Sequence, residues 1–341
     1  MVLPNVPLPL GRCPSCHAPG AVGEACVERV CRMRGYCCVP VSGGVFDPGF
    51  IESDPLIGQR CGDYLLVSMI GTGGFGRIYK ALQLPIGRPV AVKMLPTDAG
   101  PTGAATLKQS SFEVEVQALA RLSHPNIVRL YQCGEHRGTP FLAMELIEGA
   151  KNLRGEMDTR AIEGRPFTLD EVEQILLQVL AGLEAAHEQQ IVHRDIKPDN
   201  IMLESVRGHG VFVRVLDFGQ AKFLEERTAT STLLGTPAYM AYEQLTRGVI
   251  GPWTDIYAVG VLAYELIAGK RPYGGVGVQE MLARKMDRHY DPWSPLANEG
   301  YPSELHTFVK NVLAMDSVDR YPSVAVTRVG LQRAMEALRK N

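Results

Sequence analysis

The feature that most constrains this chain is a short polar segment, His193-Arg-Asp195-Ile-Lys197-Pro-Asp-Asn200, which follows an amphipathic helix pattern. An aspartate can accept a hydroxyl proton, a lysine two residues later can neutralise a transferring phosphoryl group, and an asparagine five residues later can hold a metal ion. A match of this length rarely arises by chance. The segment therefore predicts a catalytic loop.

A second motif supports this interpretation. Asp217-Phe-Gly219 begins seventeen residues after Asn200 and directly follows an apolar strand pattern, VFVRVL. A carboxylate at the end of a strand, followed by glycine, suits a metal ion that phosphate also chelates. Alone the tripeptide would indicate little, but its spacing from the catalytic loop predicts that Asp217 and Asn200 share a metal ion.

The N-terminal part of the globular region carries a glycine-rich turn, Gly71-Thr-Gly73-Gly-Phe-Gly76, between two strand patterns. Such a turn lets backbone N–H groups approach phosphate oxygens without an intervening Cβ. A plain glycine-rich hairpin is the alternative. A dinucleotide fingerprint is excluded, because a strand and not a helix follows the turn.

Lys93 ends the apolar strand segment Val90-Ala-Val-Lys93, where a lysine is costly unless it is paired. An outward-facing lysine on an edge strand is the alternative. The partner is expected on the next helix, where Glu113 and Glu115 are the candidates. Glu115 shares a helical face with apolar residues at spacings of three and four, so we expect Glu115 to face inward.

The order of elements predicts an α+β fold. Tyr64–Ile70, Gly76–Gln83 and Pro89–Leu95 read as strands, a helix follows through SFEVEVQALARLSH, and the pattern after Asp170 is mainly helical. The long patterns are EVEQILLQVLAGLEAAHE, which is amphipathic, and TDIYAVGVLAYELIAG, which is largely apolar and should be buried. We expect a strand-rich lobe followed by a helical lobe.

In this order and spacing the motifs resemble the eukaryotic-type (Hanks-type) serine/threonine protein kinase family, over residues 62–338. The resemblance implies the two-lobed kinase fold, with lobes at about 62–148 and 149–338. It also implies ATP, Mg²⁺ or Mn²⁺, and protein substrates. The catalytic residues it implies are Asp195, Lys197, Lys93 and Glu115. The nucleotide-binding residues it implies are Gly71, Gly73, Gly76, Ile78, Ala91, Lys93, Met144, Glu145, Ile147, Asn200 and Asp217, the last two through Mg²⁺.

Further segments extend the resemblance and also depart from it. Asp255 looks like the aspartate that braces the catalytic loop, and Arg320 like the arginine that pairs with the glutamate of an Ala-Pro-Glu motif. That motif reads Ala-Tyr-Glu243 here, which keeps the glutamate. The position expected to hold the ATP ribose falls on Lys151 or Asn152 and not on an acid.

Six of the eight cysteines fall before Val39. Clustering of this kind in a reducing compartment favours a metal site over disulfides. Cys-x-x-Cys spacing suits Zn²⁺, and the chosen ligands are Cys13, Cys16, Cys26 and Cys31. His17 is a weaker candidate, and Cys37 and Cys38 are spare. Some bacterial kinases of this family carry a similar zinc-ribbon-like segment. We therefore divide the chain into a module at 1–40, a linker at 41–61 and the kinase domain at 62–338.

Composition limits the remaining functions. The net charge of −2 gives no support for binding nucleic acid through bulk charge, and no apolar run approaches a membrane span. We expect a cytoplasmic protein, and a homodimer for autophosphorylation stays open. A pseudokinase scaffold is the first rival function, although it would normally lack Lys93, Asp195 or Asp217. A docking role for the cysteine segment is the second.

The segment between Asp217 and Glu243 carries the phosphosite candidates Thr228, Thr230, Ser231 and Thr232. In the family that the chain resembles, an arginine such as Arg194 gathers a phosphate on this segment by charge-assisted pairing. We predict autophosphorylation within 228–232, which mass spectrometry after incubation with ATP would detect. An unmodified segment in a catalytically active sample would rule it out.

Overall fold

The computed structural model describes residues 10–41, 54–73, 76–95, 122–206, 210–218, 237–296 and 299–341. The chain forms two compact units, Met1–Pro101 with Arg129–Leu146 and Thr102–Val128 with Ile147–Asn341. Of the helices in the described ranges, none has both the length and the apolar character that a membrane crossing requires.

An antiparallel six-stranded sheet forms the centre of the first unit, in the order β4-β5-β6-β7-β9-β8. Its strands are β4 (Arg60–Cys61), β5 (Tyr64–Gly73), β6 (Gly76–Gln83), β7 (Arg88–Met94), β8 (Leu130–His136) and β9 (Thr139–Glu145). The three strands expected from the sequence correspond to β5, β6 and β7. Alternation places Tyr79, Val92 and Ala143 on one face, where they form an apolar core.

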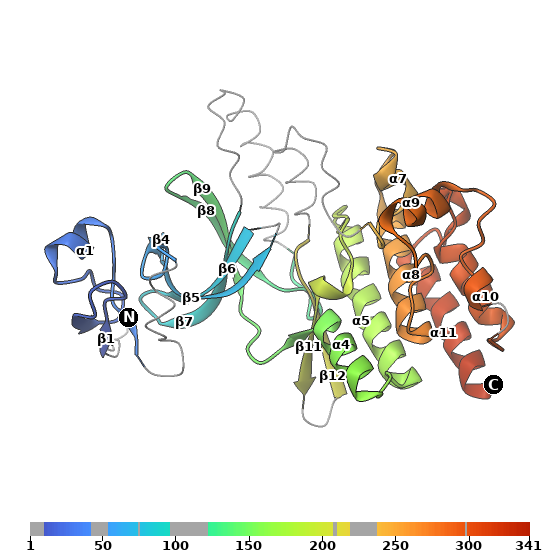
Figure 1. Ribbon diagram of the computed structural model, residues 1–341, viewed down its shortest axis with the longest axis horizontal. Coiled ribbons are helices and arrows are strands. Elements are labelled where there is room, and N and C mark those ends of the chain that lie inside the picture. The colour runs from blue at the N-terminus through green and yellow to red at the C-terminus, as the bar shows by residue number, and fades with distance from the viewer. Residues whose placement is uncertain are drawn as a thin grey trace. The chain divides into compact units, whose positions relative to one another are not determined.

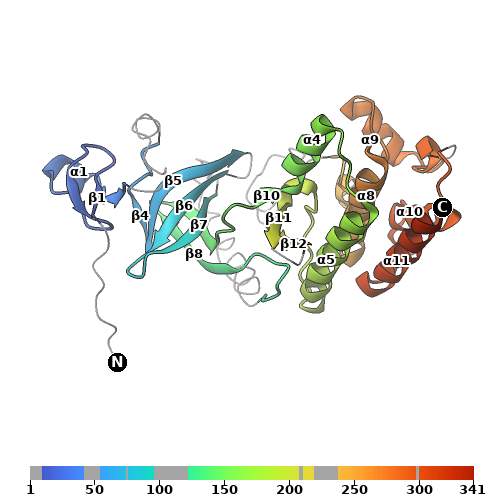
Figure 2. The ribbon, with the colours of Figure 1, turned by 90° about the horizontal axis from the view of Figure 1, so that it is seen from below.

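The cysteine-rich segment folds as a small sheet, β2-β1-β3, with one short helix. Its elements are β1 (Leu10–Arg12), β2 (Pro19–Ala21), α1 (Arg29–Met33) and β3 (Val39–Pro40). In Figure 2, α1 and β1 lie beside the end of the large sheet that carries β4. Val22, Val39 and Cys37 pack with Leu65 of β5 in a shared apolar cluster. The segment therefore shares a core with the large sheet.

Residues 54–61 belong to the segment that we expected to act as a linker, but they are packed. Asp54, Ile57 and Gln59 are each 3% exposed. Asp54 accepts a hydrogen bond from the Tyr79 hydroxyl at 2.7 Å, and the Gln59 side chain donates to the Arg34 carbonyl at 3.0 Å. These buried polar contacts hold the segment between the cysteine module and the sheet. Residues 42–53 lie outside the described part.

The second unit is mainly helical, as expected. Its helices are α4 (Leu153–Glu163), α5 (Leu169–Glu188), α7 (Tyr242–Leu245), α8 (Pro252–Ala268), α9 (Val278–Met286), α10 (Ser303–Val312) and α11 (Val324–Lys340). Figure 1 shows α5, α8, α10 and α11 packed together. The apolar helix α8 is buried along nearly its whole length, as predicted from its sequence. A small sheet of β10 (Lys151–Asn152), β11 (Ile201–Val206) and β12 (Gly210–Val215) completes the unit.

A buried ion pair joins distant parts of the helical unit. The Arg320 guanidinium donates to both carboxylate oxygens of Glu243, at 2.8 and 2.9 Å. Its remaining three N–H donors reach the carbonyls of Ala314, Met315 and Trp253. All five donors of the buried arginine are therefore satisfied. The pair predicted from the sequence is present.

We expect Arg320→Met to lower the free energy of unfolding by about 3–5 kcal/mol, because it leaves the Glu243 carboxylate buried without a cation. Urea denaturation followed by tryptophan fluorescence can measure this, since both tryptophans, Trp253 and Trp293, lie in the helical unit. Arg288→Met is the matched control, because Arg288 and its partner Asp316 are largely exposed. Equal stability of the two variants would contradict the prediction.

Candidate active site

The polar segment after α5 forms a loop that orients the Asp195 carboxylate. Lys197 Nζ donates to both carboxylate oxygens of Asp195, at 2.8 and 3.1 Å. Asn200 Nδ2 donates to the backbone carbonyl of Asp195 at 2.7 Å and to its Oδ2 at 2.9 Å. Among the described residues Asn200 uses only its amide nitrogen in these bonds, which leaves its Oδ1 for a metal ion. The structure thus brings Asp195, Lys197 and Asn200 together.

Asp255 anchors this loop through hydrogen bonds to its backbone. It is fully buried in the first turn of α8 and accepts hydrogen bonds from the backbone N–H groups of His193 (2.9 Å) and Arg194 (2.8 Å). His187 Nε2 lies 2.8 Å from the same carboxylate. Arg194 has a left-handed backbone, with φ of 68°, which is strained for a residue with a Cβ. The bonds to Asp255 stabilise that conformation, as the bracing role predicted for this aspartate requires.

The loop is also tied to the segment that carries Asp217. His193 Nε2 bonds the Leu216 carbonyl at 2.6 Å, and Leu216 N–H donates to the Asn200 carbonyl at 2.8 Å. The His193 ring contacts the Phe218 ring edge-on, with centroids 4.5 Å apart. Asp217 itself adopts a left-handed backbone, with φ of 62°, which aspartate tolerates well. The catalytic loop and the segment that carries Asp217 are therefore joined in one hydrogen-bonded network.

Gln244 is a residue of this site that the sequence analysis missed. Its side-chain Nε2 donates to the Arg194 carbonyl at 2.7 Å, and its Oε1 accepts from the Ala241 N–H at 2.9 Å. One amide therefore joins the catalytic loop to the segment before α7. The only available signal was its position next to Glu243, which does not reveal a contact across 50 residues.

In the sheet of the first unit, four of the predicted nucleotide-binding residues, Ile78, Ala91, Lys93 and Met144, share one face. Ile78 pairs with Lys93, and Ala91 pairs with Met144, so their side chains lie on the same side of β6, β7 and β9. Lys93 is 2% exposed. Glu145 pairs with Val90 and therefore points its side chain to the opposite face.

Two glycines of the glycine-rich turn, Gly76 and Gly73, differ in the space available for a Cβ. Gly76 has φ of 110°, and a Cβ there would lie 2.0 Å from the Met94 carbonyl oxygen, so the backbone excludes any other residue. A Cβ at Gly73 would meet no atom of the described residues within 4 Å. Packing against the described residues therefore explains Gly76 but does not explain Gly73.

Several predicted residues lie outside the described part or are engaged elsewhere. Glu113, Glu115, Gly219 and the candidates at 228–232 are outside it. Asn152 accepts a hydrogen bond from the Gly155 N–H at 2.7 Å and caps α4, whereas the Lys151 side chain is 67% exposed and near Glu156. Ile147 follows β9 and is half-buried.

The four cysteines chosen as zinc ligands gather at one point. The sulfur atoms of Cys13, Cys16, Cys26 and Cys31 all lie within 4.8 Å of one another. Tetrahedral Zn²⁺ with Zn–S distances of about 2.3 Å separates its sulfurs by about 3.8 Å, so the set fits this ion. Burial raises the pKa of the Cys13 thiol, which a bound cation would reverse. None of the four forms a disulfide.

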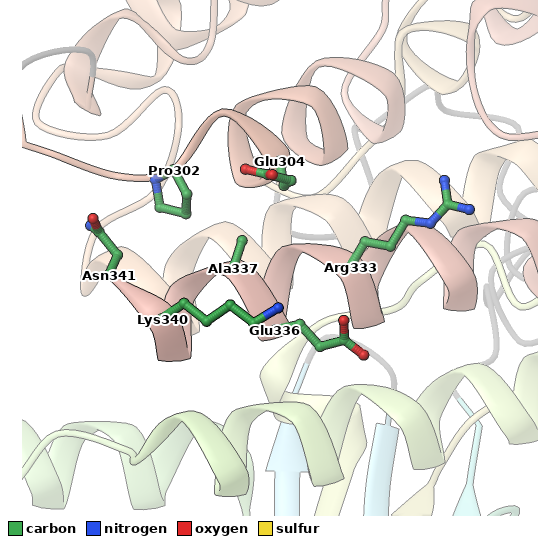
Figure 3. A pocket seen from close by; sticks show the side chains of 7 residues that line it. All are labelled: Pro302, Glu304, Arg333, Glu336, Ala337, Lys340 and Asn341. Atoms are coloured by element: carbon green, nitrogen blue, oxygen red, sulfur yellow. The ribbon is translucent and has the colours of Figure 1, made fainter.

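A separate pocket of about 430 Å³ lies between α10 and the end of α11. Figure 3 shows its lining, which consists of Pro302, Glu304, Arg333, Glu336, Ala337, Lys340 and Asn341. Its charges are of both signs, and it contains none of the predicted catalytic residues. It therefore gives no support for a second active site.

Comparison with known proteins agrees with this geometry. The profile of the protein kinase domain matches residues 64–329. The chain belongs to the protein kinase family. This kinase chain is 39% identical to the serine/threonine-protein kinase Pkn1 of Myxococcus xanthus over 336 residues, which cover 95% of the chain and 45% of Pkn1. It is 34% identical to the serine/threonine-protein kinase PknL of Mycobacterium tuberculosis over 301 residues, which cover 87% of the chain and 70% of PknL.

Solved structures show the same fold. The kinase domain of PknI from Mycobacterium tuberculosis superposes with a TM-score of 0.62 at 22% identity, covering 82% of this chain and 98% of that domain. The two-lobed kinase fold predicted from the sequence is confirmed, with a β-rich N-terminal part and a helical C-terminal part. The kinase chain spans less than half the length of Pkn1.

Proposed function

We propose that this chain transfers the γ-phosphoryl group of ATP to serine and threonine hydroxyls of proteins. The observation that carries the proposal is the orientation of the Asp195 carboxylate by Lys197 and Asn200, on a loop that Asp255 braces. Lys197 in the family's position also favours serine and threonine over tyrosine.

The residues of the loop account for the transfer as follows. The Asp195 carboxylate accepts the proton of the substrate hydroxyl, whose oxygen forms a bond to the γ-phosphorus while the bond to the β-phosphate oxygen breaks and ADP leaves. Lys197 lies beside that carboxylate and neutralises charge on the phosphoryl group. Mg²⁺, when bound, neutralises the phosphates, and Asn200 Oδ1 with the Asp217 carboxylate would hold it. Both offer oxygen ligands, which suit this ion.

The sheet residues supply the nucleotide side of the proposal. Ile78, Ala91 and Met144 offer an apolar surface for the adenine, and Lys93 on the same face would hold the α- and β-phosphates. No described residue crowds a Cβ position at Gly73, which is compatible with phosphate oxygens approaching the backbone there. We keep Glu115 as the proposed partner of Lys93. A pseudokinase scaffold is less well supported, because Lys93, Asp195 and Asp217 are all present.

We predict that Asp195→Asn lowers kcat for protein phosphorylation by a factor of roughly 10²–10⁴, because the amide cannot accept the hydroxyl proton. Binding of ATP should persist, since the substitution keeps the shape of the side chain. A radiolabel transfer assay with a nucleotide-binding measurement would show both. Asp199→Asn is the matched control, as Asp199 lies on the same loop and is exposed. Undiminished transfer by Asp195→Asn would refute the proposed mechanism.

We further propose that Cys13, Cys16, Cys26 and Cys31 bind one Zn²⁺. Under reducing conditions the purified chain should hold about one equivalent, and less than about half an equivalent would count against the site. Cys26→Ser should lose the metal and lower the melting temperature of the first unit, because the module packs on Leu65. Cys133→Ser, on β8 and outside the cluster, should retain the metal.

A further inference from the structure

Lys285 is a buried lysine on α9 that points its ammonium group at one short stretch of backbone. Its Nζ donates to the carbonyl oxygens of Pro237 (3.0 Å), Ala238 (2.7 Å) and Met240 (2.8 Å). The residue is 4% exposed. All three N–H donors of one ammonium group are therefore used by a segment 45–48 residues earlier in the chain.

This arrangement is not explained by packing. Burial, together with the positive charge of Arg320, lowers the pKa of Lys285 to about 7. An apolar side chain would fill the same volume without the cost of removing an ammonium group from water. Within the described part of the chain, no carboxylate lies within ion-pair distance of Nζ. The carbonyl groups, together with the rings of Tyr257 and Tyr273 at 5.1 and 5.3 Å, are its partners.

The segment that Lys285 holds adjoins the catalytic loop. Gln244 joins Ala241 N–H to the Arg194 carbonyl, one residue before Asp195. Tyr239, in the middle of the segment, is buried and its hydroxyl bonds the Glu265 carboxylate and Arg154. A polypeptide whose hydroxyl reaches Asp195 must therefore pass close to residues 237–241.

We propose that Lys285 is a positioning residue that fixes the backbone of residues 237–241 as the surface on which the residues beside the target serine or threonine are selected. The inference rests on the proposed function, because it needs Asp195 to act on a peptide hydroxyl. With three carbonyls turned toward one cation, the peptide planes of the segment cannot rotate, and the part-exposed side chains of Pro237 and Met240 are presented in one arrangement. Without the ammonium group, buried carbonyls lose their donor and the segment can adopt others.

The test compares Lys285→Met with the unchanged chain on a serine peptide library randomised beside the phosphorylated residue. Methionine nearly matches the length of the lysine stem, and a pocket of about 630 Å³ adjoins the site and gives the new side chain room. We expect kcat/KM for the preferred peptide to fall about tenfold, the size of losing hydrogen bonds from a charged donor, mainly through a higher KM. The preference between peptides should flatten, while KM for ATP stays the same.

Two further variants control the test. Lys310→Met makes the same chemical change at an exposed lysine of the same pocket, and it should leave peptide selection unchanged. Lys285→Gln keeps two N–H donors and should restore part of the selectivity, and it serves in place of Lys285→Met should that variant fail to fold.

The outcomes separate the two proposals. Peptide preferences that are the same in Lys285→Met and the unchanged chain would overturn the role of Lys285. A lower melting temperature with an equal loss of kcat on every peptide would also overturn it, because it would indicate a structural role only. An unchanged chain that phosphorylates no peptide in the library would instead contradict the proposed function.

Discussion

The conformation of the catalytic loop depends on the fully buried carboxylate of Asp255. Asp255 sits at the N-terminal turn of α8, where unpaired helical N–H groups favour negative charge. From there it accepts the backbone N–H groups of His193 and Arg194 and so stabilises a left-handed residue directly before the catalytic base. The orientation of Asp195 therefore follows from the packing of α8, the most apolar of the described helices. The catalytic loop, most of whose residues are buried, is thereby held by the core of the helical unit.

Buried polar side chains of the helical unit also hold residues 237–244 in place. Glu243 is anchored by Arg320 and by the Thr254 hydroxyl, and Gln244 reaches the catalytic loop. Lys285 holds the carbonyls of Pro237, Ala238 and Met240. Each of these is a polar side chain whose buried donors or acceptors are matched by partners distant in sequence. Such matched networks specify one backbone arrangement, because any alternative leaves buried polar groups without partners. The replacement of proline by Tyr242 in the family's Ala-Pro-Glu motif does not disturb this anchoring.

The sequence predicted best those parts of the fold and of the site whose residues lie close together along the chain. The spacing of Asp195, Lys197 and Asn200 within six residues fixes their meeting on one loop, and alternation along β7 places Ala91 and Lys93 on one face. The four cysteines were likewise chosen from short spacings, and their sulfur atoms gather as expected. The fold class followed from the change from strand patterns to helix patterns.

What the sequence did not reveal depends on contacts across long separations. Nothing near Lys285 in the sequence indicates that its partners are carbonyls 45–48 residues earlier. Every residue has a backbone carbonyl, so the sequence does not mark the ones that accept a hydrogen bond from a side chain. The segment at 54–61 was expected to be a linker from its Gly, Pro and Asp content, yet Asp54 finds the Tyr79 hydroxyl only in the folded sheet.

The apolar cluster around Leu65 has a consequence for how the chain can be divided. Its residues come from both sides of the boundary at which the kinase profile begins. A recombinant fragment trimmed to that boundary would leave Leu65 facing water and would remove Asp54, the partner of the buried Tyr79 hydroxyl. The cysteine segment is thus not an independently tethered module, because it packs directly on the large sheet. A transplanted catalytic domain would keep Leu65 covered only together with the preceding cysteine segment.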